Sequence, residues 1–366
     1  MFARLIVYNL TMSRDLADKI ASGGRITARE ALKLFKSDDI FALGELASLV
    51  AKRKNGSKVY YIRNVHVNPT NICVNRCKFC AFSRSRGEDG AYELTNREII
   101  KKLKKIRLKG KELFDEVHIV GGLHPDWDFE HYLEMLEAIK ENFPGVRIKG
   151  FTAVEADHMR EKSGLPLKTV FAKLKSSGLD VMPGGGAEIF DPGVRGALCP
   201  EKLSGRDWLK VMKEAHNAGI RSNATMLYGH IENYEHRVSH LESIRRLQDE
   251  TGGFQAFIPL PYQPETEIGG RASSGIEDLK CIAVSRIFLD NIDHIKAYWV
   301  MLGEKLSQVA LLFGADDLEG TVIEEKIAHS AGARTRTGLT ETELERMIAK
   351  TGKKAVRRDS FYRRIA

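Results

Sequence analysis

The sequence predicts an α/β fold in which eight parallel strands and the helices between them form a (β/α)8 barrel of the TIM type. The chain has 366 residues and is 43% hydrophobic, so it can bury a core of barrel size. Strand-like and helix-like segments alternate from Val59 to Phe313, and polar residues gather after the strand-like segments. Active sites of such barrels lie at that end. A doubly wound open sheet is the alternative, and the eight units favour the barrel.

The first 56 residues are predicted to be a helical extension outside the barrel. Thr27-Ala-Arg-Glu30 is a capping box in front of apolar residues at helical spacing. A second helix, over about 39–54, ends in basic residues followed by Asn-Gly, which is a helix stop. We therefore expect an extension over 1–56, with Met12 as an alternative start. The barrel would cover 57–325, and a helical segment with a basic tail would cover 326–366.

The predicted strands are short segments rich in apolar residues. They are Val59–Val67, Glu116–Val120, Val146–Ala153, Leu179–Met182, Arg221–Tyr228, Gln255–Leu260, His294–Val300 and Gln308–Phe313. Amphipathic helices are predicted between most of them. One helix begins at the capping box at Thr95 and ends at Gly110, and another is capped by Ser204 and ends at Gly219. The other predicted helices are Phe129–Asn142, Tyr234–Asp249 and Glu277–Asn291.

Composition and charge exclude some classes of function. Lysine and arginine number 57 against 49 acidic residues, a formal charge of +8. The basic residues are spread out and no aromatic-interleaved motif accompanies them, which disfavours nucleic-acid binding. No run of about 18 apolar residues exists, so no membrane span is predicted. Free thiols and the lack of a secretory signal predict a reducing cytoplasm. The sequence does not predict the oligomeric state.

Three cysteines after the first predicted strand carry the chemistry. Cys73, Cys77 and Cys80 have the spacing C-x3-C-x2-C. Three thiolates on one tight loop can hold three corners of a 4Fe-4S cluster and leave the fourth iron free to bind a small molecule. A zinc site would usually add a second pair of cysteines or histidines, and an odd cysteine count disfavours disulfides. Cys199 and Cys281 are predicted to be buried apolar residues.

The cysteine spacing within Asn68–Arg84 resembles the radical S-adenosylmethionine (SAM) superfamily. The resemblance implies that the open iron chelates the amino and carboxylate groups of SAM. An electron from the cluster then cleaves the sulfonium and gives a 5′-deoxyadenosyl radical. It further implies that Phe79 contacts the adenine and that Gly121 and Gly122 bind the methionine amino group. Glu155, at a predicted strand end, is expected to hydrogen-bond the ribose hydroxyls.

Within the superfamily the chain resembles the group of aminofutalosine synthase, dehypoxanthine futalosine cyclase and the two deazaflavin-forming synthases. The shared motifs are Asn68-Pro-Thr-Asn, Val120-Gly-Gly-Leu-His-Pro, Pro183-Gly-Gly-Gly-Ala-Glu and Leu247-Gln-Asp-Glu-Thr-Gly-Gly-Phe254. The likeness is greatest to the aminofutalosine synthase family, through Gly150–Glu155, Ile189–Arg195, Cys199–Gly205 and Ser222–His230. The segment Glu265–Gly270 departs from the pattern, because relatives commonly have an Asn-Thr pair there.

This likeness implies a reaction in menaquinone synthesis by the futalosine route. The 5′-deoxyadenosyl radical would add to the enol ether of 3-[(1-carboxyvinyl)oxy]benzoate, and loss of bicarbonate would give aminodeoxyfutalosine. SAM would be a co-substrate, and flavodoxin or ferredoxin would supply the electron. A substrate with two carboxylates needs cationic or hydrogen-bonding partners, and the candidates are His124, Arg195, Tyr228 and His230. The cyclase alternative would release 5′-deoxyadenosine, and a non-enzymatic metal or nucleic-acid binder is a remote alternative.

Overall fold

A curled sheet of seven parallel strands forms the centre of the molecule. The computed structural model describes residues 13–109 and 114–365. The strands pair in chain order, so each crossover returns the chain to the next position in the sheet. These strands are β2 (Asn64–Val67), β3 (Glu116–Ile119), β4 (Arg147–Gly150), β5 (Val181–Met182), β6 (Arg221–Tyr228), β7 (Phe254–Pro261) and β8 (His294–Ile295). The sequence-based prediction of an α/β barrel is confirmed in this form.

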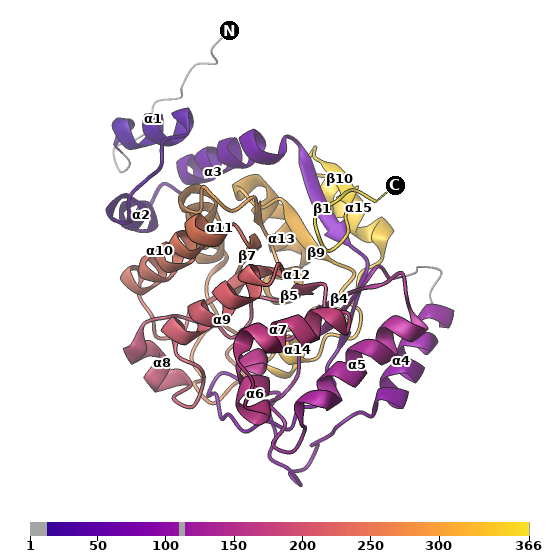
Figure 1. Ribbon diagram of the computed structural model, residues 1–366. Coiled ribbons are helices and arrows are strands. Elements are labelled where there is room, and N and C mark those ends of the chain that lie inside the picture. The colour runs from indigo at the N-terminus through magenta and orange to yellow at the C-terminus, as the bar shows by residue number, and fades with distance from the viewer. Residues whose placement is uncertain (1–12, 110–113, 366) are drawn as a thin grey trace.

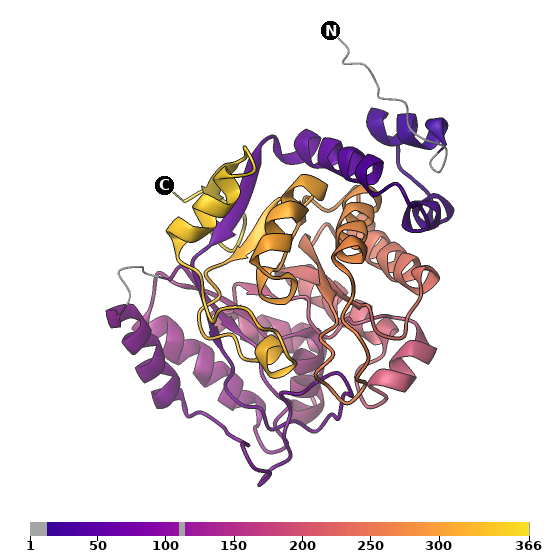
Figure 2. The same cartoon turned by 180° about the vertical axis from the view of Figure 1, so that it is seen from behind.

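A second, three-stranded sheet completes the wall of the barrel. Its order is β10 (Lys354–Arg357), β1 (Lys58–Ile62), β9 (Asp317–Gly320). Single-residue bridges join the β9 segment to both edges of the seven-stranded sheet, Lys296 to Asp317 on one side and Val65 to Ile323 on the other. Segment 317–323 therefore spans the gap between β8 and β2. Figures 1 and 2 both show the yellow C-terminal segment beside violet β1.

Helices surround the strands (Figure 1). The N-terminal extension consists of helices, as predicted: α1 (Arg14–Ser22), α2 (Ala28–Phe35) and α3 (Ile40–Asn55). The capping box at Thr27 and the cap at Ser204 form as expected. The remaining helices are α4 (Asn96–Lys109), α5 (Phe129–Asn142), α6 (Ala153–Ser163), α7 (Leu167–Ser176), α8 (Pro192–Leu198), α9 (Gly205–Asn217), α10 (Tyr234–Thr251), α11 (Gly275–Phe288), α12 (Trp299–Leu302), α13 (Glu304–Ala310), η1 (Leu311–Phe313), α14 (Ile327–Ser330) and α15 (Glu341–Ala349).

The predicted eighth strand, Gln308–Phe313, is wrong. This segment continues α13 into the short helix η1, with Leu311 buried and Leu312 exposed. A short apolar run does not distinguish a strand from a buried helix. The strand that takes the eighth place in the barrel is β9, which follows the predicted segment and was not among the predicted strands. The first predicted strand is also divided, because β1 and β2 belong to different sheets.

Several other predictions concern boundaries. The proposed start at Met12 and the helix stop at Gly110 lie outside the described residues. Segment 326–366 holds α14 and α15, but it also contributes strand β10, so the proposed division into 1–56, 57–325 and 326–366 stays a prediction. Within the part of the chain that the structure describes, no helix is both long and apolar enough to cross a membrane.

The two faces of the barrel strands differ in polarity. On β2 and β3 the residues Val65, Val117 and Ile119 belong to the apolar core shared with the helices. Alternate residues point to the opposite face of a strand, and on these two strands those positions hold His66 and His118, which are in register with each other. The interior of the barrel is therefore polar, whereas its outer layer is apolar.

Candidate active site

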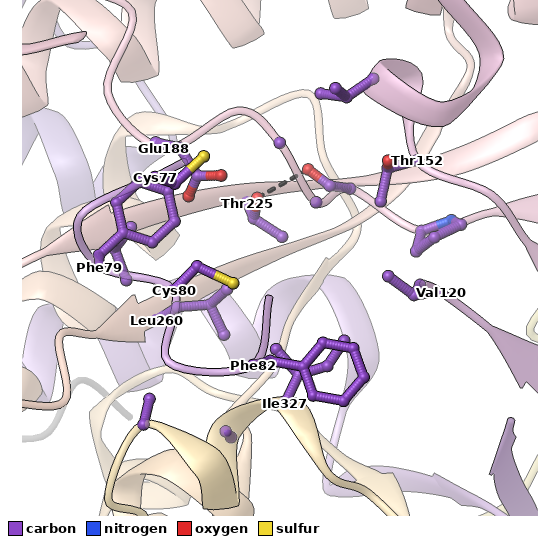
Figure 3. A pocket seen from close by; sticks show the side chains of 18 of the residues that line it. Cys77, Phe79, Cys80, Phe82, Val120, Thr152, Glu188, Thr225, Leu260 and Ile327 are labelled. Atoms are coloured by element: carbon purple, nitrogen blue, oxygen red, sulfur yellow. Dashed lines mark hydrogen bonds between the residues drawn. The ribbon is translucent and has the colours of Figure 1, made fainter. Parts of the chain in front are cut away.

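A cavity of about 320 Å³ opens at the carboxyl end of the strands. All three cysteines of the predicted cluster loop line it, and so do residues from the ends of most barrel strands. Figure 3 shows Cys77, Phe79 and Glu188 on one side of this cavity and Thr152 and Val120 on the other. The lining also includes Asn68, Gly121, Gly122, Glu155, Lys202, Asn223, Thr225, Leu227, Ile258, Leu260 and Tyr262.

The cysteine loop is fixed by hydrogen bonds to neighbouring strand ends. Asn68 Nδ2 donates to Val120 O at 2.8 Å, and Val74 N donates to Leu123 O at 3.0 Å. On the other side, Arg76 N donates to the Glu201 carboxylate at 2.6 Å and Lys78 N donates to Leu198 O at 2.9 Å. The loop is therefore held from both sides before any ligand binds.

Gly121 and Gly122 allow the cysteine loop to lie against the end of β3. A Cβ atom on Gly122 would lie 2.2 Å from Ile72 O, a distance that real side chains do not adopt. Gly122 N donates to Thr70 O at 2.9 Å, and Gly121 N donates to Glu155 Oε1 at 3.0 Å. Both N–H groups are used within the protein, so an incoming amino group would find carbonyl oxygens as acceptors.

Glu155 has a structural role that the sequence reading did not predict. It is the N3 residue of the capping box that opens α6, where its Oε2 accepts from Thr152 N at 2.7 Å. The same side chain accepts from Gly121, so it ties α6 to the glycine pair. Burial raises the pKa of Glu155 to about 7, although these hydrogen bonds oppose the shift. Glu155 also lines the cavity, and its predicted contact with the ribose stays a prediction.

The ionisation of Glu155 makes a testable contribution to stability. Its pKa is higher in the folded chain than the ordinary 4.5, so protonation favours the folded state. This stabilisation is complete below pH 4.5 and is lost as the pH rises through 7, at a cost of about 3 kcal/mol. Denaturant titrations of the cluster-free chain between pH 4.5 and 8 should show this loss relative to Glu155→Gln. Parallel pH profiles of the two proteins would contradict the assignment.

A buried ion pair forms the wall beside the cysteine loop. Lys202 Nζ lies 2.7 Å from Glu188 Oε1 and 5.0 Å from the centre of the Phe79 ring. Burial alone would raise the pKa of Glu188, but Lys202 outweighs it and the pKa lies below its usual value. Both residues line the cavity. The ammonium group of Lys202 is thus held at the cluster end, and the sequence reading did not single it out.

The four residues predicted to meet the substrate carboxylates do not line the cavity. Among the described residues, His124 Nε2 lies 2.8 Å from Glu93, and His230 contacts Glu232 at 2.9 Å. Tyr228 donates to Asp278 at 2.8 Å. Arg195 donates to the carbonyl oxygens of Ala187 and Ile189. Tyr228 ends β6 and the other three lie after a strand end, and each side chain contacts another group of the protein, although Arg195 Nε is buried without a hydrogen-bond partner among the described residues. Arg195 in particular holds the backbone of the glycine-rich loop at 186–189.

Charged side chains fill the barrel below the cavity. Lys149 Nζ lies 2.8 Å from Glu116 and 2.7 Å from Glu319, and Lys296 also pairs with Glu319. Arg358 Nε lies 2.7 Å from Asp317. Oxygen atoms of Glu116 and Glu319 come close to a ring nitrogen of His118, but the two ammonium groups already neutralise these carboxylates. A divalent cation there would face two lysines, so the group is an ion-pair network.

Comparison with known proteins identifies the superfamily. The description "Radical SAM superfamily" fits residues 67–244, and "CofH/MqnC C-terminal region" fits residues 251–365. An aminodeoxyfutalosine synthase of Thermus thermophilus is 44% identical over 96% of this chain and 95% of its own length. The chain belongs to the radical SAM superfamily. The resemblance predicted from the cysteine spacing is confirmed.

Further radical SAM relatives carry two different names. A Streptomyces coelicolor protein named aminodeoxyfutalosine synthase is 40% identical over 96% of this chain and 93% of its own length. A Methanocaldococcus jannaschii protein is 41% identical over 92% of this chain and 96% of its own, and is named 5-amino-6-(D-ribitylamino)uracil–L-tyrosine 4-hydroxyphenyl transferase. The solved structure of methylornithine synthase shares the fold, with a TM-score of 0.75, 20% identity and coverage of 93% of this chain and 97% of its own.

The radical SAM assignment specifies the cofactors, a 4Fe-4S cluster and SAM, and the residues present fit both. Cys73, Cys77 and Cys80 provide three free thiols on one loop and line a shared cavity, so these residues would hold three irons of a cluster and leave the fourth without a protein ligand. When bound, the cluster supplies the electron that cleaves SAM. The protein's own part is to position the reactants and to exclude water from the cavity.

Proposed function

We propose that this radical SAM enzyme adds the 5′-deoxyadenosyl radical of SAM to 3-[(1-carboxyvinyl)oxy]benzoate and, with loss of bicarbonate, forms aminodeoxyfutalosine for menaquinone synthesis. The observation that carries the proposal is the 44% identity to the Thermus aminodeoxyfutalosine synthase across nearly the whole of both chains. A reductant such as flavodoxin or ferredoxin would deliver the electron. The walls of the cavity above its polar floor suit an aromatic substrate, because Leu227, Ile258 and Leu260 line it.

The cavity residues divide between the two substrates in this proposal. Carbonyl oxygens of Gly121 and Gly122 accept from the methionine amino group, and Phe79 packs against the adenine. Glu155 holds the ribose end, so its loss would weaken SAM binding more than it changes the product. Lys202, held at the cluster end by Glu188, is the cation nearest to a methionine carboxylate. The apolar part of the lining, which includes Leu227, Ile258 and Leu260, would help to exclude water and so protect a radical from side reactions.

The fate of the adenosyl group tests the proposal. The anaerobically reconstituted and reduced enzyme would receive SAM labelled with carbon-13 in its adenosine part, together with the enol-ether benzoate. We expect the label in a product with the mass of aminodeoxyfutalosine, because the radical is incorporated. Mass spectrometry of the quenched reaction measures this directly. Label found only in free 5′-deoxyadenosine, with the benzoate untouched and a nucleoside substrate consumed, would favour the cyclase reaction instead.

A second candidate is the reaction named for the methanogen relatives. Their identity of up to 41% over most of the chain is close to that of the aminodeoxyfutalosine synthases. Transfer of the 4-hydroxyphenyl group of tyrosine to 5-amino-6-(D-ribitylamino)uracil would then be catalysed in the same cavity. Incubating the same reduced enzyme with these two compounds and SAM separates the candidates. A coupled uracil product without any adduct of the benzoate would replace our proposal.

A further inference from the structure

Two histidines in the barrel each have a buried ring nitrogen that finds no hydrogen-bond partner among the described residues. His66 on β2 and His118 on β3 are in register, and their ring centres are 4.4 Å apart. Within the described residues, neither ring makes a hydrogen bond or an ion pair, and His66 Nε2 and His118 Nδ1 are buried without a partner. His66 is only 7% exposed. Buried polar atoms in folded proteins are almost always hydrogen-bonded, so an unpartnered pair calls for an explanation.

Both histidines line the cavity, at its deep end. Each comes two residues before a position near the rim, His66 before Asn68 and His118 before Val120, which also line the cavity. Two residues of a strand span about 7 Å. The histidine pair is therefore one layer below the strand ends that carry the cysteine loop, and a ligand that reaches it occupies the floor of the same cavity.

The charges around the pair determine what a ligand must bring. Burial lowers the pKa of His66. Burial, together with the nearby His66 and Lys149, holds the pKa of His118 well below its usual value. Both rings are therefore neutral at pH 7. The charged groups that face the pair are three carboxylates and two ammonium groups: Glu116, Glu319, Glu325, Lys149 and Lys296. The surroundings are thus slightly negative, and an anion can be accepted there only if a proton enters with it.

We propose that His66 and His118 together bind the carboxylate on the aromatic ring of the substrate, and that the pair takes up one proton when it does so. This inference rests on the proposed function. The enol-ether carbon must meet SAM near the cysteine loop, so the opposite end of the molecule points to the floor. There, two imidazole N–H groups donate to the carboxylate oxygens, with one ring charged. Val120 and Ile258, which also line the cavity, flank the benzene ring.

Calorimetry on the wild-type holoenzyme tests the proton uptake. The reconstituted enzyme with SAM, kept unreduced and anaerobic, would be titrated with the enol-ether benzoate in buffers of different ionisation enthalpy. We expect uptake of about one proton per ligand and a Kd that rises about tenfold per pH unit above pH 7. An analogue with a carboxamide in place of the ring carboxylate should show neither effect. Identical binding enthalpies in all buffers would overturn the proposal.

Substitution of the two histidines gives an independent measurement. His66→Gln and His118→Gln should each raise the Kd and the KM of the benzoate by about 10- to 100-fold, with a smaller change in kcat, since the lost contact is remote from the reacting carbon. His131→Gln is the matched control, because His131 Nε2 is also buried without a partner but lies outside the cavity. Unchanged affinity in both variants would refute the assignment.

The outcomes separate this inference from the proposed function. If the wild-type enzyme forms the adenosylated product while both glutamine variants bind the benzoate normally, the function stands and the histidine subsite is wrong. If the wild-type enzyme forms no such product, the function itself fails before the variants are compared. Circular dichroism and cluster absorption of each variant confirm that the fold and the cluster are intact.

Discussion

The Cys77→Ala protein is expected to lose its cluster iron, its visible absorption and all activity. Three thiolates would hold the cluster, and no other cysteine lines the cavity among the described residues; the two histidines that line it, His66 and His118, lie one strand layer below the cysteine loop. With one thiolate removed, two remain for four irons, which is too few for a stable cubane. Cys73→Ala and Cys80→Ala should behave alike. Iron analysis and absorption spectra after anaerobic reconstitution measure the effect.

The two remaining cysteines provide the controls. Cys281 is fully buried in the apolar core on α11, so Cys281→Ala should retain iron, spectrum and activity. Cys199 is the stricter control, because it is buried directly after Leu198, whose carbonyl accepts from Lys78 in the cysteine loop. Cys199→Ala should also keep its cluster. A full complement of iron in Cys77→Ala would end the assignment of Cys77 as a ligand.

Local signals in the sequence predicted the longest helices, α3, α4, α5, α9, α10 and α11, but not α6 and α7. The capping boxes at Thr27 and Thr95 form because a side chain and a backbone group three residues apart satisfy each other without help from the rest of the chain. Gln308–Phe313 was predicted wrongly because a short apolar run fits a strand and a buried helix equally well. The strand β9 was missed because Asp317 and Glu319 are charged, and their partners lie far away in the sequence.

The sequence predicted the site residues that lie close together along the chain, but not those brought together from distant strands. Cys73, Cys77 and Cys80 identify themselves by spacing. His124 and Tyr228 were predicted to meet the substrate only because they follow strands, and their side chains instead contact Glu93 and Asp278. The histidine pair in the barrel did leave a signal, an apolar–His–apolar pattern in Val65–Val67 and Val117–Ile119. That pattern becomes informative once the two strands are known to be adjacent.

The buried ion pairs inside the barrel, which the sequence did not predict, give the largest expected effect of a substitution on stability. Lys149 is 3% exposed and contacts both Glu116 and Glu319. Burial opposes its charge, but the two carboxylates outweigh this and raise the pKa of Lys149. Burial likewise opposes the charge of Glu319, yet Lys149 and Lys296 hold its pKa well below the usual value. Each charge in this network is therefore stable only because its partners are present.

Lys149→Met should lower the free energy of unfolding by about 3–5 kcal/mol, because it leaves the buried Glu116 without a counter-charge and Glu319 with Lys296 alone. The methionine keeps most of the side-chain volume, so the loss reports charge and not a cavity. Lys213→Met is the matched control, since Lys213 forms an exposed pair with Glu250 at 2.7 Å and its removal should change little. Urea titrations at pH 7 of both variants and the wild type measure the difference. Equal midpoints for Lys149→Met and Lys213→Met would show that the network in the barrel does not stabilise the fold.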